Sequence, residues 1–329
     1  MQKFTSVADV SNVEELVTLA RDLKSRPQAH HHLGQHKTLG LIFLNPSLRT
    51  RLSTQKAGLN LGMNVIVMNM DKEGWALEFQ DGAVMNGTTV EHIKDAAAVM
   101  GQYCDILGIR AFPTLKDREE DYGEHLLKKF IRHCKVPVVS LESATLHPLQ
   151  SLADLITIRE WQPDGRRPKV VLTWAPHIKA LPQAVPNSFA EWMCRADLDF
   201  TIAHPKGLEL APQFTDGARI LHDQHEALED ADFVYVKNWS AYEPYGQLYS
   251  GGEDWLLDNA KIAHTHQAKI MHCLPVRRNV ELSDELLDGP QSLILEQANN
   301  RTFAAQAVLL QMLADRKSTR LNSSHLVIS

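Results

Sequence analysis

Short apolar segments alternate with helical patterns along the chain, and this alternation constrains the fold more than any other feature of the sequence. The first half has apolar runs at residues 38–44, 64–70, 104–112 and 136–142. Helical spacing of apolar residues marks residues 13–25, 91–102 and 118–134, and a further helix is predicted from Ser47 onward. Strands that are apolar on both faces are typical of a parallel sheet with helices on either side.

The alternation starts again in the second half. A helix at residues 149–161 ends at the turn signal Pro-Asp-Gly at 163–165, and strands are predicted at residues 169–174, 199–204, 232–239 and 270–274. A last helix covers about residues 300–315, and the polar, Ser-rich residues 316–329 are interpreted as a disordered or non-native tail. The predicted α/β fold has two doubly wound parallel-sheet domains joined by helices, with the active site in the cleft between them. The first domain is 1–148 with the helix at 300–315, and the second is 149–299.

The charge balance excludes several classes of function. The 34 basic and 40 acidic side chains give a net charge of −6, so no basic excess is available to bind nucleic acid or a membrane. No apolar stretch approaches ~18 residues and the N-terminus lacks an apolar signal core, so we expect neither a membrane span nor export. The four cysteines are widely spaced, which argues against a disulfide or zinc framework and favours the cytoplasm.

A phosphate site is predicted where the first apolar strand ends. Neither the GxGxxG nor the GxxxxGK[ST] fingerprint occurs in the chain. Instead the strand at residues 38–44 leads into Asn-Pro-Ser-Leu-Arg-Thr-Arg, in which Ser47 is a candidate N-cap and Arg49 and Thr50 open the helix. Hydroxyls and guanidiniums at a helix N-terminus suit a phosphate group. The alternative is a capped surface helix with two solvated arginines.

Three further polar clusters follow predicted strands. Arg110 ends one strand, the sequence His-Pro-Leu-Gln at 147–150 follows another, and His-Cys-Leu-Pro at 272–275 ends a strand of the second domain. A single histidine in such a place is usually structural. Ligands of open α/β sheets bind at the carboxyl ends of strands, so several clusters there favour a binding cleft.

The sequences SLRTR, HPLQ and HCLP, in this order and spacing, resemble the signature of the aspartate and ornithine carbamoyltransferase family, over nearly the whole chain to about residue 315. The resemblance implies that the first domain binds carbamoyl phosphate, that the second binds an amino acid, and that homotrimers place active sites at subunit interfaces. It implies no cofactor and no metal. An inactive paralogue that only binds carbamoyl phosphate is the alternative from another class.

The resemblance also implies roles for individual residues. Ser47, Leu48, Arg49 and Thr50 would hold the phosphate, and Arg301, placed just after a predicted strand SLILEQ, would add a guanidinium. Catalysis would rest on Arg49 and on the hydrogen bonds of Arg110 and His147 to the carbamoyl oxygen, whose negative charge grows as the carbonyl becomes tetrahedral. Gln150 and the backbone carbonyls of Cys273 and Leu274 would bind the carbamoyl NH₂ and the incoming amine. The amine would attack directly, and a nucleophilic role for Cys273 is not favoured over a buried small side chain.

Three stretches resemble the branch of the family that carbamoylates N-acylornithines: Gly-Trp at 74–75, Val-Met-Asn-Gly at 84–87 and Thr-Trp-Ala-Pro-His at 173–177. In that branch the Trp matching Trp75 reaches the carbamoyl phosphate site of the neighbouring subunit, and residues matching Glu142 and Lys237 bind the acceptor. The proline-rich loop at 176–186 would close over the acceptor and bring His177 toward it, or would be a rigid connector.

Val90 bears on which acyl group is accepted. It aligns with a Glu in enzymes for N-acetylornithine and with a Pro in enzymes for N-succinylornithine, and a Glu would repel the succinyl carboxylate. The resemblance therefore favours N-succinyl-L-ornithine as acceptor, giving N-succinyl-L-citrulline and phosphate in arginine biosynthesis, with N-acetyl-L-ornithine as the second choice.

Overall fold

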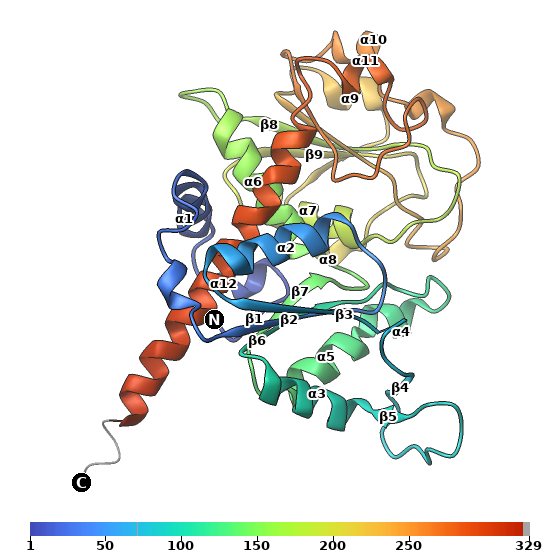
Figure 1. Cartoon of the computed structure of the whole chain (residues 1–329). Coiled ribbons are helices and arrows are strands. Elements are labelled where there is room, and N and C mark those ends of the chain that lie inside the picture. Colours follow the sequence, from blue (N-terminus) through green and yellow to red (C-terminus); the bar gives the residue numbers. More distant parts are fainter. Residues whose placement is uncertain (71, 325–329) are drawn as a thin grey trace. The chain divides into compact units, whose positions relative to one another are not determined.

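The computed structural model describes residues 1–70 and 72–324, with the side chains of 315–324 left outside the description. The chain divides into two units (Figure 1). The first contains Met1–Phe112, Glu124–Ser143 and the residues from Arg301 onward, and the second contains Pro113–Gly123 and Ala144–Asn300. Residues 113–123 thus belong to the second unit, although the chain on either side of them belongs to the first.

The first unit is built on a five-stranded sheet in which every pairing is parallel. Its strand order is β1 (Lys3–Phe4), β7 (Val138–Glu142), β6 (Ile106–Arg110), β2 (Thr38–Phe43) and β3 (Asn64–Asn69). Helices α3 (Ile93–Tyr103) and α5 (His125–His133) lie on one face, and α2 (Arg49–Asn60) and α12 (Ile294–Ser324) lie on the other (Figure 1). Helix α1 is Val13–Ser25, and strands β4 (Leu77–Glu78) and β5 (Glu91–His92) form a separate parallel pair.

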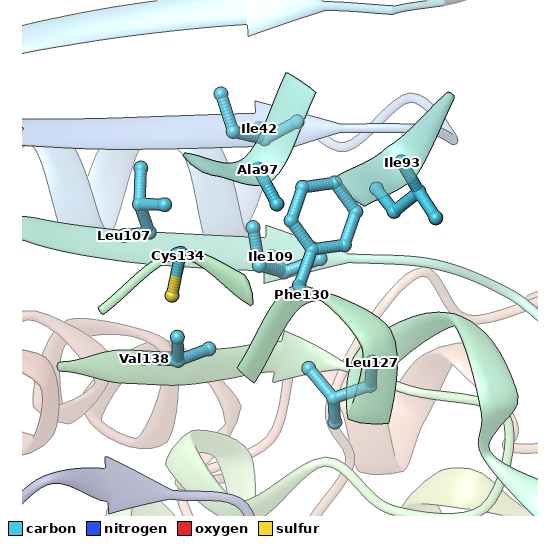
Figure 2. Close-up of a cluster of buried hydrophobic side chains, with 9 residues drawn as sticks. All are labelled: Ile42, Ile93, Ala97, Leu107, Ile109, Leu127, Phe130, Cys134 and Val138. Atoms are coloured by element: carbon cyan, nitrogen blue, oxygen red, sulfur yellow. The ribbon is translucent and has the colours of Figure 1, made fainter. Parts of the chain in front are cut away.

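A buried cluster fixes α3 and α5 to this sheet. Figure 2 shows Phe130 of α5 among Ile93 and Ala97 of α3 and Leu107 and Ile109 of β6, and all five side chains are buried. Burying a large apolar side chain stabilises a fold by roughly 1.5–3 kcal/mol. The cluster therefore holds β6 firmly, and Arg110 is the last residue of that strand.

The second unit has its own five-stranded, all-parallel sheet. Its strand order is β10 (Arg219–Leu221), β9 (Asp199–Ala203), β8 (Lys169–Trp174), β11 (Phe233–Lys237) and β12 (Lys269–Met271). Its longer helices are α6 (Pro148–Trp161) and α7 (Ala184–Met193), and its short ones are α4 (Arg118–Gly123), α8 (Pro212–Thr215), α9 (Gln224–Leu228), α10 (Asn259–Ile262) and α11 (Asp284–Leu287). Two parallel sheets flanked by helices confirm the predicted α/β class. No helix of the described residues has the length and apolar character to cross a membrane.

Several predicted elements are wrong in detail. The helix predicted at 118–134 is two helices, because Glu124 between α4 and α5 adopts a left-handed conformation with φ of 49°. The helix predicted from residue 91 begins at Ile93, since the two residues before it form β5. The loop predicted at 176–186 ends inside α7, whose first turn accommodates Pro186 because the N–H that proline lacks has no intrahelical partner there.

The last helix also differs from prediction. Residues 292–297, predicted as a strand, contain only an isolated bridge from Ser292 to Ile270, and α12 begins at Ile294. Apolar runs of this length fit either structure, so periodicity alone could not decide. The backbone of α12 continues to Ser324, whereas irregular structure was predicted from residue 316. No Gly or Pro interrupts this stretch, and residues 325–329 of the predicted tail lie outside the described residues.

Candidate active site

The turn between β2 and α2 forms the first part of the candidate site. Helix α2 begins at Arg49, and Leu48 occupies the N-cap position without a side-chain cap. The prediction that Ser47 caps this helix is therefore wrong, because the helix begins one residue too late for its hydroxyl to be in the N-cap position. The N–H groups of the first turn receive no capping side chain, and with the helix dipole they favour an anion.

Two guanidinium groups lie close to the hydroxyl of Thr50, which is in the first turn of α2. Arg301 donates from Nη2 to Thr50 Oγ1 at 2.6 Å, and Arg110 Nη1 lies 3.5 Å from the same oxygen. Burial lowers the pKa of Arg110, Glu142 opposes that change and the positive charge of Arg49 adds to it. The first unit thus gathers Arg49, Arg110 and Arg301 about one helix N-terminus, a strongly positive arrangement.

A shift in the pairing of β6 with β7 places Glu142 beside Arg110. Ile109 pairs with Ser140, but Arg110 pairs with Glu142, so β7 has one extra residue at this point. Arg110 Nη2 and Glu142 Oε2 are 3.0 Å apart, and both side chains are buried. A charged bidentate group held this way is preorganised for stabilising a developing oxyanion. Glu142, predicted to bind the acceptor, here pairs with Arg110.

The predicted subunit-bridging and specificity residues lie together on an exposed segment of the first unit. The Trp75 indole is 55% exposed and donates from Nε1 to Glu91 Oε2 at 2.8 Å. Val90 is 64% exposed, and its N–H donates to the carbonyl of Ala76 at 2.8 Å. Two residues separated by fifteen positions become neighbours because β4 pairs with β5.

In the second unit, His147 is the N-cap residue of α6 and Gln150 lies in the first turn of that helix. Both side chains are buried. Gln150 donates from Nε2 to Asp154 Oδ1 at 2.7 Å, one helical turn further along. The Asp154 carboxylate therefore fixes the orientation of the Gln150 amide, with its NH₂ group toward the carboxylate.

The segment after β12 has a strained backbone that is held by a histidine. Leu274 has a φ of 56°, a left-handed conformation that is uncommon for a bulky side chain. Its N–H donates to His272 Nδ1 at 2.8 Å, and His272 Nε2 lies 2.8 Å from Glu281 Oε2. Nδ1 accepts, so the ring proton is on Nε2 and points to the carboxylate. The backbone at Cys273 and Leu274 is thus fixed through His272.

Glu281 also organises the residues predicted to bind the acceptor. Asn238 donates from Nδ2 to Glu281 Oε1 at 2.9 Å, and Lys237 at the end of β11 donates to Asn238 Oδ1. His177 Nε2 lies 3.8 Å from the same carboxylate. Burial alone would raise the pKa of Glu281, but the hydrogen bond from His272 and the positive groups around it lower the pKa overall.

Sequence reasoning assigned no role to two of these residues. Arg277 donates from Nε to His177 Nε2 at 3.0 Å, which places a guanidinium beside a predicted acceptor residue. Glu281 is 1% exposed, yet its neighbours in the sequence suggest an ordinary polar loop. The only available signal for Arg277 was its place directly after HCLP. Burial of the His177 ring, with Lys237 and Arg277 beside it, lowers its pKa, so the ring is neutral at pH 7.

The fold and these two groups of residues define the class of protein. A model of the aspartate/ornithine carbamoyltransferase carbamoyl-P binding domain matches residues 2–160. A model of the aspartate/ornithine carbamoyltransferase Asp/Orn binding domain matches residues 182–312. The chain belongs to the aspartate/ornithine carbamoyltransferase family and is a carbamoyltransferase, as its motifs predicted.

Its similarity to individual relatives is extensive. The chain is 50% identical over 315 residues to N-succinylornithine carbamoyltransferase of Bacteroides thetaiotaomicron, which covers 95% of this chain and 99% of that protein. It is 35% identical to N-acetylornithine carbamoyltransferase of Xanthomonas campestris, over 85% of this chain and 88% of that one. A mutant N-acetyl-L-ornithine transcarbamylase complexed with carbamyl phosphate and N-succinyl-L-norvaline matches with a TM-score of 0.88 and 32% identity, covering 95% of this chain and 100% of that one.

Proposed function

We propose that this protein transfers the carbamoyl group of carbamoyl phosphate to the side-chain amine of N-succinyl-L-ornithine, producing N-succinyl-L-citrulline and phosphate. The observation that carries the carbamoyl phosphate part is the uncapped N-terminus of α2, where Arg301 and Arg110 meet at Thr50. Relatives 50% identical over 95% of the chain, named for N-succinylornithine, support the acceptor.

In the proposed reaction the first turn of α2 holds the phosphate. Ser47 and Leu48 lie in the turn that leads into the helix, and Arg49 and Thr50 begin it. Arg110 and His147 hydrogen-bond the carbamoyl oxygen and stabilise the charge that develops there, while the oxygen of Gln150 and the carbonyls of residues 273 and 274 bind N–H groups. The neutral amine attacks the carbonyl carbon, the C–O bond to phosphate breaks, and phosphate leaves with the amine proton. No covalent enzyme intermediate is needed.

The second unit supplies the acceptor side in this proposal. An acylated α-amine carries no charge, whereas the α-carboxylate remains and needs a cation. Lys237 provides one, and the neutral ring of His177 with Arg277 beside it offers further hydrogen-bonding groups. Glu142 would be the remaining residue that binds the acceptor substrate, and it would do so while paired with Arg110.

The acyl group is discriminated at Val90 in this proposal. An exposed valine neither repels nor displaces a succinyl carboxylate. Mutants of N-acetyl-L-ornithine transcarbamylase in which one glutamate is replaced by alanine, valine, serine or proline have been solved with N-succinyl-L-norvaline. These complexes support the idea that replacing the glutamate allows a succinyl group to bind. Val90 is predicted to occupy the position of that glutamate.

We further propose that the protein is a cytoplasmic homotrimer in which Trp75 serves the carbamoyl phosphate site of a neighbouring subunit. The exposed apolar side chains of Trp75, Val84 and Val90 on one segment support an interface there. The four cysteines, none of which forms a disulfide, suit a reducing compartment.

The direct test offers ornithine, N-acetyl-L-ornithine and N-succinyl-L-ornithine in parallel with carbamoyl phosphate and measures the ureido product. The proposal expects the succinyl compound to have the highest kcat/KM. Preference for the acetyl compound would refute the choice of acceptor. Phosphate release that does not depend on any acceptor would instead favour a paralogue that binds carbamoyl phosphate without transferring it.

A further inference from the structure

Gln297 is a buried glutamine near the start of α12 that uses both ends of its side-chain amide. The residue is 1% exposed. Its Nε2 donates to Asp154 Oδ1 of α6 at 2.7 Å, and its Oε1 accepts from the backbone N–H of His272 at 2.9 Å. His272 directly follows β12, so this one amide connects α6, α12 and the segment after β12, and all three residues belong to the second unit.

The partners of Gln297 fix which way round its amide lies. The ionised carboxylate of Asp154 only accepts hydrogen bonds, so it faces the NH₂ group, whereas the N–H of His272 only donates and faces the oxygen. Turning the amide around would set its oxygen against the carboxylate and its NH₂ group against the N–H. Amide orientation is normally a matter of assignment, but here the two partners decide it.

The Gln297 side chain continues a row of backbone hydrogen bonds along the outer side of β12, which is an edge strand of its sheet. The N–H of Ile270 donates to the carbonyl of Gln291 at 2.9 Å, and the carbonyl of Ile270 accepts from the N–H of Leu293 at 2.8 Å. N–H groups two residues apart on a strand point the same way, so the N–H of His272 comes next in this row. Gln297 Oε1 takes the place that a backbone carbonyl would have there, and it therefore sets the position of His272.

Through His272 this contact reaches the turn to which the proposed function assigns substrate binding. Nδ1 of His272 accepts from the N–H of Leu274 at 2.8 Å, and Leu274 has a φ of 56°. Such a backbone conformation persists only where the surrounding contacts determine it. We propose that Gln297 is a positioning residue that aims the carbonyls of Cys273 and Leu274 at the carbamoyl NH₂ and the incoming amine. The inference rests on the proposed function, in which these carbonyls bind those N–H groups.

Replacing Gln297 by leucine removes both hydrogen bonds and keeps a similar volume. A displaced turn weakens binding of the acceptor and misaligns the attacking amine. With the acceptor that the wild type carbamoylates best, we expect kcat/KM to fall roughly tenfold or more in Gln297→Leu, the value of one well-made hydrogen bond. Inorganic phosphate binds to the first unit in the proposed function, so its inhibition constant should stay unchanged.

Asn300→Leu is the matched control for general stability. Asn300 is 0% exposed and lies one turn further along α12, and its Nδ2 donates to Thr157 Oγ1 at 2.9 Å and to Glu160 Oε2 at 2.8 Å, both on α6. The control therefore also removes two buried hydrogen bonds made by α12, but it leaves the contact with His272 intact. We expect both leucine variants to lower Tm by comparable amounts, and only Gln297→Leu to lose kcat/KM when folded protein is assayed well below either Tm. Equal kinetic losses would show that Gln297 acts only through general stability, which would overturn the proposal.

Gln297→Glu tests the same contacts with almost no change of shape, and it decides the matter if Gln297→Leu does not fold. Its new carboxyl group lies against Asp154, and because two adjacent carboxylates repel each other, the pair keeps one proton to an unusually high pH. While that proton is present, the hydrogen bond to Asp154 and the acceptor for His272 both remain. Tyr235 of β11 also lies beside Asp154, and burial raises its pKa well above the usual value, so it stays neutral. The kcat/KM of Gln297→Glu, divided by that of the wild type at the same pH, should therefore be highest at about pH 6 and fall toward about pH 9.

The remaining outcomes separate this inference from the proposed function. Wild-type kinetics in folded Gln297→Leu, or a ratio for Gln297→Glu that does not change with pH, would overturn the role of Gln297 and leave the proposed function standing. A wild-type protein that carbamoylates none of ornithine, N-acetyl-L-ornithine and N-succinyl-L-ornithine would overturn the proposed function and this inference together.

Discussion

Replacing Glu281 by glutamine should destabilise the second unit far more than the small change in structure suggests. Both carboxylate oxygens of Glu281 accept hydrogen bonds, one from His272 and one from Asn238. Glutamine has one acceptor oxygen, so its NH₂ must meet one of these two donors. Neither neighbour can adapt, because His272 Nδ1 accepts from Leu274 and the oxygen of Asn238 accepts from Lys237.

The expected loss follows from these contacts. A lost hydrogen bond to a charged group and a buried donor left unpaired together cost about 3 kcal/mol of unfolding free energy. For a unit of this size, that loss lowers Tm by roughly 6–12 °C. Calorimetry of wild type and Glu281→Gln measures it, and Glu285→Gln on the exposed side of α11 is the matched control, with a shift near zero. We also expect kcat/KM for the acceptor to fall roughly tenfold, with KM for carbamoyl phosphate nearly unchanged.

The dependence on pH provides a second check. The pKa of Glu281 is lower in the folded protein than the ordinary value near ~4.3 of an unfolded chain. Its ionised form therefore contributes stability that is fully present above that value and is lost as the pH falls through the lower folded pKa. The Tm difference between wild type and Glu281→Gln should narrow below about pH 4.3. Equal Tm values at pH 7, or a difference no larger than that of Glu285→Gln, would show that the carboxylate does not organise this part of the unit.

Three further predictions concern the proposed site. Arg49→Ala should act mainly by raising KM for carbamoyl phosphate, whereas Arg110→Ala should lower kcat by roughly 10²-fold or more, as for loss of one oxyanion donor; wild-type kinetics in either variant would contradict the assignment. Mixing Trp75→Ala subunits with His147→Ala subunits should restore some activity, because some interfaces then carry two intact halves; mixed oligomers, verified by mass, that stay inactive would show that each site comes from one chain. Val90→Glu should shift kcat/KM from N-succinyl- toward N-acetyl-L-ornithine by roughly tenfold, since repulsion between carboxylates at ~4 Å and an effective dielectric near 20 reaches about 4 kcal/mol before solvent reduces it. An unchanged ratio in folded Val90→Glu protein would exclude this residue from selecting the acyl group.

The sequence predicts helices and strands best where the apolar periodicity is clear and no turn residue contradicts it. Helix α1 and strand β8 have the bounds expected from periodicity. Helix α7 was missed because the prolines of residues 176–186 indicated a loop, although Pro186 fits the first turn of the helix. Strand β10 is only three residues long and mostly exposed, so it has no apolar run to indicate it.

The candidate site divides in the same way. Motifs placed Thr50, Arg110 and Gln150 at strand ends and helix starts, because those positions depend on neighbours in the sequence. The contacts of Asp154 with Gln297, and of Glu281 with Asn238, join residues far apart in the chain. Only an acidic residue within the apolar helix α6 hinted at the first of them, and no local pattern indicated the second.

The interleaving of the two units has a consequence for biosynthesis. A ribosome completes β1 and β2 of the first unit early, but the stretch that begins at Arg301 also belongs to that unit and is translated only after the whole of the second. The N-terminal sheet therefore leaves the ribosome before α12, one of the helices that cover it, has been synthesised. Thr50 and its hydrogen-bond partner Arg301 are 251 positions apart in the chain, so this bond forms only late in synthesis. We therefore expect nascent chains of this protein to be prone to aggregation and proteolysis until translation is nearly finished. Neither unit can be produced by cutting the gene at a single point.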